Sequence, residues 1–160
     1  MKKILTWEEL KKEADRLRGE GKKIAFTNGC FDILHVGHVQ YLREARKTGD
    51  ILVLGLNSDA SVRAIKGGKR PLVPQGERAE VVASLMSVDY VAVFDETTPL
   101  NLIMHLRPDI LVKGGDWEEE EVVGREAVRS WGGKVVIVPM TDGASTTRIV
   151  EKICRIYGID

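Results

Sequence analysis

Two histidines three positions apart are the residues of this chain best suited to chemistry. His35 and His38 flank Gly37 and follow a short segment that contains Asn28 and Gly29. Residues at positions i and i+3 of a helix share a face, so both imidazoles can address one ligand if a helix begins here. The backbone N–H groups and the dipole at a helix start attract phosphate. We interpret the pair as hydrogen-bond donors to phosphate; the alternatives are two structural histidines and a metal pair that lacks a third ligand nearby.

A second anion-binding sequence stands near the end of the chain. Gly143 and Ala144 precede three hydroxyl side chains, those of Ser145, Thr146 and Thr147, where the last helix is expected to begin. Hydroxyl groups and free N–H groups at such a position can hold phosphate oxygens. Two phosphate-binding sequences in one small domain predict a nucleoside triphosphate as the ligand.

Strand and helix patterns alternate along most of the chain. The unbroken apolar run 51–56 is typical of a strand buried on both faces of a parallel sheet. The alternation predicts an α/β fold, a doubly wound, Rossmann-like parallel sheet with right-handed crossovers. The expected strands are 22–27, 51–56, 90–94, 109–113 and 134–138, and the expected helices are 36–47, a short helix ending at 65, 75–86, 99–106, 122–131 and 146–157.

An N-terminal helix precedes this pattern. Thr6 and Glu9 have the spacing of a capping box, and apolar residues then recur at helical intervals until Gly19 and Gly21. We therefore expect residues 1–22 to form a helical extension in front of the main domain. The apolar residues of the helix are Trp7, Leu10, Ala14 and Leu17.

Composition limits the function classes. The chain has 160 residues, with 24 Lys plus Arg and 24 Asp plus Glu, so its formal net charge is zero. This balance argues against nucleic acid or a membrane surface as the principal partner. No apolar run approaches the ~20 residues that a bilayer span needs, and the N-terminus turns polar too early for a signal peptide. We expect a cytoplasmic protein whose two cysteines, Cys30 and Cys154, are reduced thiols, with no local pattern that makes Cys30 a nucleophile.

The distinctive sequences fall where the predicted strands end. They are 27–29, 57–59, 113–116 and the segment around Ser145. In open α/β sheets, ligands bind beyond the carboxyl ends of the strands, at the point where the strand order reverses. We therefore expect these segments to share one cleft.

Two of these segments resemble known signatures. Residues 29–38 resemble the first signature of the cytidylyltransferase-like nucleotidyltransferases, and residues 145–147 resemble the second, a helix start that receives the β- and γ-phosphates. The resemblance extends from about residue 24 to the end and implies that 23–160 is a nucleotidyltransferase domain. It implies in-line attack of a substrate phosphate on the nucleotide α-phosphorus, with pyrophosphate leaving and no covalent intermediate. Such transfer needs little beyond alignment and charge neutralisation.

Within that superfamily, the chain is similar to the heptose 1-phosphate adenylyltransferases. The similar segments are 27–32, 55–62, 66–67, 70–71, 98–99, 108–109 and 113–116. This resemblance implies ATP and D-glycero-β-D-manno-heptose 1-phosphate as substrates, ADP-heptose as a product for cell-envelope polysaccharide, and Mg²⁺ that arrives with the nucleotide, since the sequence shows no protein-only metal cage. Family members often dimerise, but no feature of this sequence decides between a monomer and a homodimer.

Two alternatives stay open. One is cytidylyl or adenylyl transfer to glycerol 3-phosphate or FMN. Glycerol-3-phosphate cytidylyltransferases usually carry an arginine shortly before the glycine of the second signature, where this chain has 140–142 without one. The other is a nucleotide-sensing module without turnover, which has no need of both imidazoles.

The resemblance and the residue chemistry together give each candidate residue an expected role. His35 and His38 would stabilise the α-phosphoryl transition state, with Lys66 and Arg46 as further phosphate-neutralising cations. The alternatives are that Asp32 braces its loop, that Asn57 and Asp59 cap a helix and that Arg78 pairs with a glutamate. The expected nucleotide contacts are Thr27, Asn28, Gly29, Cys30, Phe31, His35, Gly37, His38, Lys113, Gly114, Asp116, Ser145, Thr146 and Thr147, and the expected acceptor contacts are Asp32, Asn57, Asp59, Arg70 and Arg78.

Overall fold

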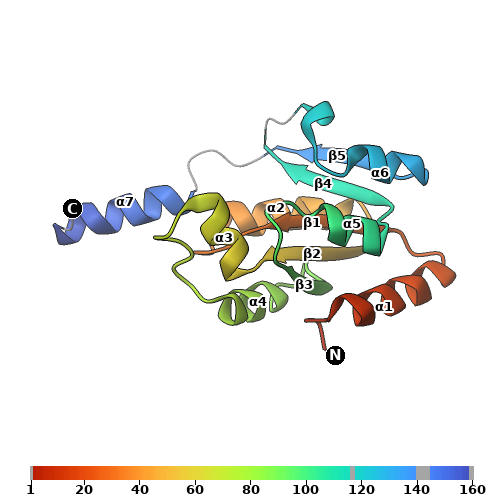
Figure 1. Ribbon diagram of the computed structural model, residues 1–160, viewed down its shortest axis with the longest axis horizontal. Coiled ribbons are helices and arrows are strands. Elements are labelled where there is room, and N and C mark those ends of the chain that lie inside the picture. The colour runs from red at the N-terminus through yellow and green to blue at the C-terminus, as the bar shows by residue number, and fades with distance from the viewer. Residues whose placement is uncertain (1, 116–117, 140–144, 159–160) are drawn as a thin grey trace.

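A five-stranded parallel sheet forms the centre of the molecule (Figure 1). The computed structural model describes residues 2–115, 118–139 and 145–158. The strand order β3-β2-β1-β4-β5 is that of a doubly wound Rossmann-like sheet, which confirms the predicted fold class. Each strand lies within two residues of its predicted position: β1 is Ile24–Gly29, β2 Ile51–Asn57, β3 Tyr90–Phe94, β4 Ile110–Gly114 and β5 Lys134–Val138.

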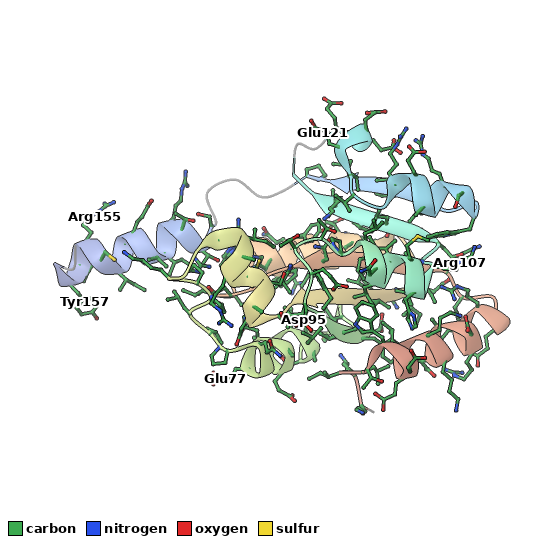
Figure 2. All side chains as sticks on the ribbon, in the orientation of Figure 1. Glu77, Asp95, Arg107, Glu121, Arg155 and Tyr157 are labelled. Carbon is green, nitrogen blue, oxygen red and sulfur yellow. The ribbon has the colours of Figure 1, made fainter. Side chains whose placement is uncertain are left out.

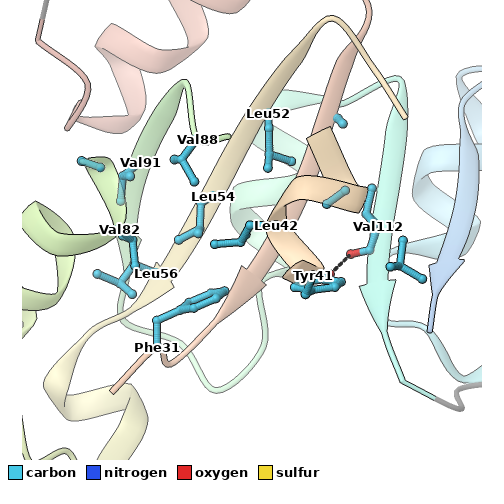
Figure 3. Close-up of a cluster of buried hydrophobic side chains, with 14 of the residues drawn as sticks. Phe31, Tyr41, Leu42, Leu52, Leu54, Leu56, Val82, Val88, Val91 and Val112 are labelled. Atoms are coloured by element: carbon cyan, nitrogen blue, oxygen red, sulfur yellow. Dashed lines mark hydrogen bonds between the residues drawn. The ribbon is translucent and has the colours of Figure 1, made fainter. Parts of the chain in front are cut away.

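Helices cover both faces of the sheet. On one face, Leu52, Leu54 and Leu56 of β2 pack with Leu42 of α2 and Val82 of α4 (Figure 3). On the other face, side chains from α1, α5 and α6 form a second apolar cluster with the strands. Alternate residues of each strand thus enter opposite cores, because successive strand side chains point to opposite faces. The helices are α1 (Trp7–Gly19), α2 (Val36–Lys47), α3 (Asp59–Lys66), α4 (Gln75–Ala83), α5 (Leu100–Leu106), α6 (Arg125–Ser130) and α7 (Thr146–Tyr157), with a short 3₁₀ turn η1 (Glu119–Glu121).

Two helices are shorter than their patterns predict. α4 ends at Ala83, and the Met86 side chain, which we expected to face inward, is 99% exposed. The chain has to leave the helix here because Asp89 must reach the start of β2, where its carboxylate accepts from the Leu52 N–H at 2.8 Å. α6 begins only after Gly124, whose φ of +93° lies outside the helical region.

The N-terminal segment is attached to the edge of the sheet. Ile4 forms a parallel bridge with Val91 of β3, and the Leu5 N–H donates to the Val91 carbonyl at 2.9 Å. The Lys3 ammonium donates to the carbonyls of Leu85 and Val88 at 3.2 and 2.7 Å, where the chain turns into β3. The predicted extension therefore shares backbone and side-chain bonds with the main domain, in addition to the apolar contacts of α1.

The capping box of α1 is present and gives a stability prediction. The Glu9 N–H donates to the Thr6 hydroxyl at 3.2 Å, and the Thr6 N–H donates to the Glu9 carboxylate at 2.8 Å. Replacing Thr6 with alanine should destabilise the protein by about 1 kcal/mol, because one helix-start donor loses its partner. Urea unfolding of Thr6→Ala beside Lys12→Ala, an exposed site on the same helix, measures this difference. Equal midpoints for the two variants would contradict the prediction.

No helix in the described part of the chain is long and apolar enough to cross a bilayer.

Candidate active site

A pocket opens at the carboxyl ends of β1 and β4, where the strand order reverses. Its cavity volume is about 200 Å³. β1 pairs with β2 on one side and with β4 on the other, and such a reversal leaves a crevice between the loops that follow the two central strands. The lining residues are Asn28, Gly29, Cys30, Phe31, His38, Tyr41, Lys113 and Gly114.

The two histidines lie together at the start of α2. His35 is the residue before the helix and makes no side-chain capping bond, and His38 follows in the first turn. Their rings stack with centroids 3.8 Å apart, and the His38 ring also contacts Phe31 at 5.0 Å. The predicted shared face is therefore present: the two imidazoles lie side by side, and His38 lines the pocket.

Both imidazoles are held in the neutral form. Burial lowers the pKa of His35 and, together with the neighbouring His35, lowers the pKa of His38 to about 4. The Nδ1 atoms of both rings are buried and have no hydrogen-bond partner among the described residues. Buried polar atoms are nearly always bonded in folded proteins, so two adjacent exceptions indicate a place where a ligand supplies the partner.

The depressed pKa of His38 gives a pH prediction. The folded pKa of about 4 lies below the ordinary value of 6.5, so between these pH values the unfolded chain binds more protons than the folded one. The contribution to stability is complete above pH 6.5 and is lost as the pH falls toward 4. A His38→Gln variant should lose less stability than the parent over this range. Urea midpoints at pH 7, 5.5 and 4.5 measure it, and parallel profiles would refute the prediction.

Two glycines let aromatic rings form the floor of the pocket. A Cβ on Gly29 would stand 2.7 Å from the Phe31 ring, and a Cβ on Gly114 would stand 2.7 Å from the Tyr41 ring. Both distances are shorter than side-chain atoms tolerate, so these positions need glycine for the close approach of backbone and ring. Of the expected nucleotide contacts, Gly29, Phe31 and Gly114 are thus brought together in the pocket; Gly37 is buried in the first turn of α2.

Thr27 does not reach the pocket surface, contrary to expectation. It is fully buried, and its hydroxyl lies 2.6 Å from the Tyr41 hydroxyl. The Tyr41 hydroxyl in turn donates to the Val112 carbonyl at 3.3 Å (Figure 3). Since the Tyr41 proton goes to Val112, the Thr27 hydroxyl donates to Tyr41. Burial raises the pKa of Tyr41 to about 12. Thr27 therefore supports the ring below the pocket, and the sequence pattern gave no sign of Tyr41 in this place.

Asp32 braces a loop, as its alternative interpretation predicts. Its buried carboxylate accepts from the N–H groups of Leu72 and Val73 at 2.9 Å and from the Arg70 guanidinium at 2.5 Å. Burial alone would raise the pKa of Asp32, but these donors outweigh it and hold the pKa below its ordinary value. Asp32 and Arg70, both expected at the acceptor site, are instead bonded to each other and fix the loop that contains the 70–73 segment.

The Arg78 side chain connects the carboxyl ends of β1 and β2 to the loop that Asp32 braces. Its guanidinium is 1% exposed and donates to the carbonyls of Cys30, Asn57 and Val73 at 2.5, 2.9 and 2.9 Å. It also pairs with the Asp59 carboxylate at 2.7 Å, rather than with a glutamate of its own helix. The Asn57 amide donates to the Ser61 hydroxyl at 2.9 Å. Arg78, Asn57 and Asp59 thus use their polar groups on one another and on backbone, and the structure gives them the role of a frame behind the pocket.

Arg46 lies at the wrong end of its helix for the predicted phosphate contact. It ends α2 near the amino ends of the strands, where it pairs with Asp89 at 2.8 Å and donates to the Gly49 carbonyl at 2.7 Å. At about 1.5 Å per residue, the length of α2 separates it from His35 by more than 10 Å. The structure therefore assigns Arg46 a structural ion pair.

Lys66 is an exposed cation whose charge acts on a residue of the pocket lining, Cys30. It ends α3 and has no hydrogen bond or ion pair within the described residues. Its charge acts on the Cys30 thiol, together with those of Arg78 and Arg70. Burial is the larger effect and raises the pKa of Cys30, so the thiol stays protonated, as expected of a residue that is not a nucleophile.

The second phosphate-binding sequence meets the histidine segment through Thr146. Its hydroxyl donates to the Ile33 carbonyl at 3.3 Å, and Ser145 caps α7 by accepting from the Arg148 N–H. Thr147, the following residue, is exposed. From this contact α7 extends away from the body of the molecule (Figure 1), and none of its residues is buried. Its Arg155 and Tyr157 side chains are exposed (Figure 2). Asp116, Gly143 and Ala144 lie outside the described residues.

A comparison with protein families covers both the histidine segment and the start of α7. The sequence model of the Cytidylyltransferase-like family matches residues 26–152, which include both histidines and the start of α7. The chain belongs to this family. The resemblance of the two signatures to this family is thereby confirmed.

Curated relatives of this cytidylyltransferase-like chain are longer proteins. It is 62% identical over 141 residues to the bifunctional protein HldE of Geobacter sulfurreducens, a match covering 88% of this chain and 29% of that protein. It is 57% identical over 155 residues to HldE of Syntrophotalea carbinolica, covering 97% of this chain and 32% of the relative. The chain thus spans less than a third of the length of these relatives.

Solved structures show the same fold. A lipopolysaccharide core biosynthesis protein from Thermoplasma volcanium superposes with a TM-score of 0.63 at 30% identity, covering 76% of this chain and 98% of that one. A pantoate-beta-alanine ligase from Francisella tularensis gives a TM-score of 0.64 at 15% identity, covering 100% and 80% of the two chains. The second likeness concerns the fold alone.

Proposed function

We propose that this domain transfers AMP from ATP to D-glycero-β-D-manno-heptose 1-phosphate, which yields ADP-heptose and pyrophosphate for cell-envelope polysaccharide. The observation that carries the proposal is the pair of neutral imidazoles at a helix start beside the pocket, whose Nδ1 atoms find no partner among the described residues. Identity to HldE proteins over most of the chain and the likeness to a lipopolysaccharide core biosynthesis protein support the heptose acceptor. ATP as a substrate favours a cytoplasmic location.

The residues support a direct displacement. An oxygen of the acceptor phosphate attacks the α-phosphorus, the bond from that phosphorus to the bridging oxygen breaks, and pyrophosphate leaves with the electron pair. His35 and His38 donate N–H groups to the α-phosphate oxygens as charge gathers there. The exposed Lys66 ammonium, near Cys30, neutralises phosphate charge from the α3 side. The attacking phosphate is already an anion, so no general base is needed.

Magnesium fits this site only as a companion of the nucleotide. Among the described residues that line the pocket there is no carboxylate, and Asp32, in the histidine segment, has both oxygens bonded to its own loop and Arg70. Within the described residues, no group of three His, Cys, Asp or Glu side chains is arranged to hold a metal ion. The phosphate oxygens would therefore be its ligands, and the ion would offset their charge.

A product assay tests the proposal. Purified protein with MgCl₂ should release pyrophosphate only when ATP and the heptose 1-phosphate are both present, and mass spectrometry should find ADP-heptose. Parallel reactions replace ATP with CTP, GTP or UTP and the sugar with glycerol 3-phosphate or FMN. Product from CTP with glycerol 3-phosphate, or from ATP with FMN, would replace the assignment, and nucleotide binding without any product would indicate a sensing module. Light scattering on the same sample distinguishes a monomer from a homodimer.

A further inference from the structure

A lysine and an asparagine meet at the floor of the pocket from two neighbouring strands. The Lys113 ammonium, at the end of β4, donates to the Asn28 side-chain oxygen, at the end of β1, over 2.6 Å. Both side chains line the same pocket as His38. The contact joins residues 85 positions apart in the sequence, and the adjacency of β1 and β4 creates it.

The charge of this lysine has no counter-ion in the part of the chain that the structure describes. Asn28 is its one hydrogen-bond partner within the described residues, and an amide oxygen is neutral. None of the described pocket-lining residues is an acid. Burial lowers the pKa of Lys113, because the ammonium has lost part of its hydration. Lysines in such surroundings are ordinarily paired with a carboxylate.

The groups near Lys113 add further positive charge and further hydrogen-bonding nitrogens to the pocket region. His35 and His38 present neutral rings with buried nitrogens that have no partner in the described part of the chain. The charges of Lys66, Arg70 and Arg78 reach the pocket at Cys30. Of these, Arg70 and Arg78 are already paired with Asp32 and Asp59. Among the described residues, Lys113 is therefore the pocket-lining cation whose charge remains uncompensated.

We infer that Lys113 binds a phosphate oxygen of the nucleotide directly, and that Asn28 is the neutral amide that holds the ammonium in place without neutralising it. This inference rests on the proposed nucleotide site and adds the group that recognises its charge. An asparagine in this place leaves the full positive charge for the ligand. An aspartate would consume that charge inside the protein and would repel the incoming phosphate.

An Asn28→Asp variant separates this role from a purely structural one. If the contact only braces β1 against β4, a carboxylate should hold the lysine as well or better, with equal or higher thermal stability and unchanged binding. If Lys113 binds phosphate, the variant should keep its stability but bind MgATP and inorganic triphosphate roughly tenfold more weakly, the size expected for losing one charged hydrogen bond. Isothermal titration calorimetry measures both ligands.

Substitutions of the lysine complete the test. Lys113→Met should weaken binding of both ligands like Asn28→Asp, and Lys113→Arg should restore most of it. Lys134→Met, an exposed lysine at the opposite end of the neighbouring strand, is the matched control and should bind as the parent does. Unchanged affinity in Asn28→Asp, or no binding of either ligand by the parent protein, would overturn the inference. Binding is measured without an acceptor, so a failure to make ADP-heptose would affect the proposed reaction and leave this result independent.

Discussion

Replacing His38 with alanine should lower kcat by about 10²- to 10³-fold, the loss typical of removing one well-placed donor to a transition-state oxyanion. The affinity for MgATP should change by only a few-fold. His38 lines the pocket, its Nδ1 has no partner among the residues that the structure describes, and the α-phosphate gathers charge only during transfer. A donor whose bond strengthens in the transition state affects turnover more than binding.

His105 provides the matched control. It is the third histidine of the chain and lies on the far side of the sheet, where its ring contacts Trp7 with centroids 5.7 Å apart. His105→Ala should keep kcat near the parent value. Steady-state kinetics give kcat for both variants, and calorimetry gives their ATP affinities. Equal losses of kcat and of ATP affinity in His38→Ala would show that the imidazole serves binding alone.

Replacing Arg78 with methionine should destabilise the fold by about 3–5 kcal/mol, the range measured when one partner of a buried ion pair is removed. The guanidinium is almost completely buried and donates to three backbone carbonyls besides Asp59. Methionine fills much of the volume but donates nothing, so the Asp59 carboxylate and these carbonyls lose their partner. Urea unfolding gives the free-energy difference.

Two further variants sharpen this experiment. Arg63→Met, at an exposed position on α3, makes the same chemical change and should cost less than 1 kcal/mol, as surface substitutions ordinarily do. The double variant Arg78→Met with Asp59→Asn should recover part of the loss, because the uncompensated carboxylate is then gone. A loss in Arg78→Met no larger than in Arg63→Met would contradict the framework role of Arg78.

The sequence predicts the elements of the fold well because their signals are local. The apolar run of β2 and the capping box of α1 each specify one element without reference to the rest of the chain, and the order of strands and helices then leads to the doubly wound sheet. The ends of α4 and α6 are less predictable. The turn toward β3 and the backbone at Gly124 decide them, and neither is visible in apolar periodicity.

The candidate site is predictable in its two signatures and not in its supporting bonds. His35 and His38 lie three residues apart, so helical geometry alone brings them together. The partners of Asp32, 38 to 41 positions away, depend on how the loop after α3 folds back. Arg70 and Arg78 have the residue type that a sugar phosphate requires, but buried acids and carbonyls occupy their donors. Residue type alone cannot distinguish a cation that awaits a ligand from one already paired.

The bridge between Ile4 and Val91 has a consequence for the protein in concentrated solution. An outer strand of a sheet presents unpaired N–H and C=O groups, onto which a strand from another molecule can add. In this protein the first residues occupy that position on β3, with the Val91 N–H donating to the Lys3 carbonyl at 2.9 Å and the Val91 carbonyl accepting from Leu5. The segment in front of α1 therefore closes the β3 edge at Val91 to pairing with a strand of another molecule.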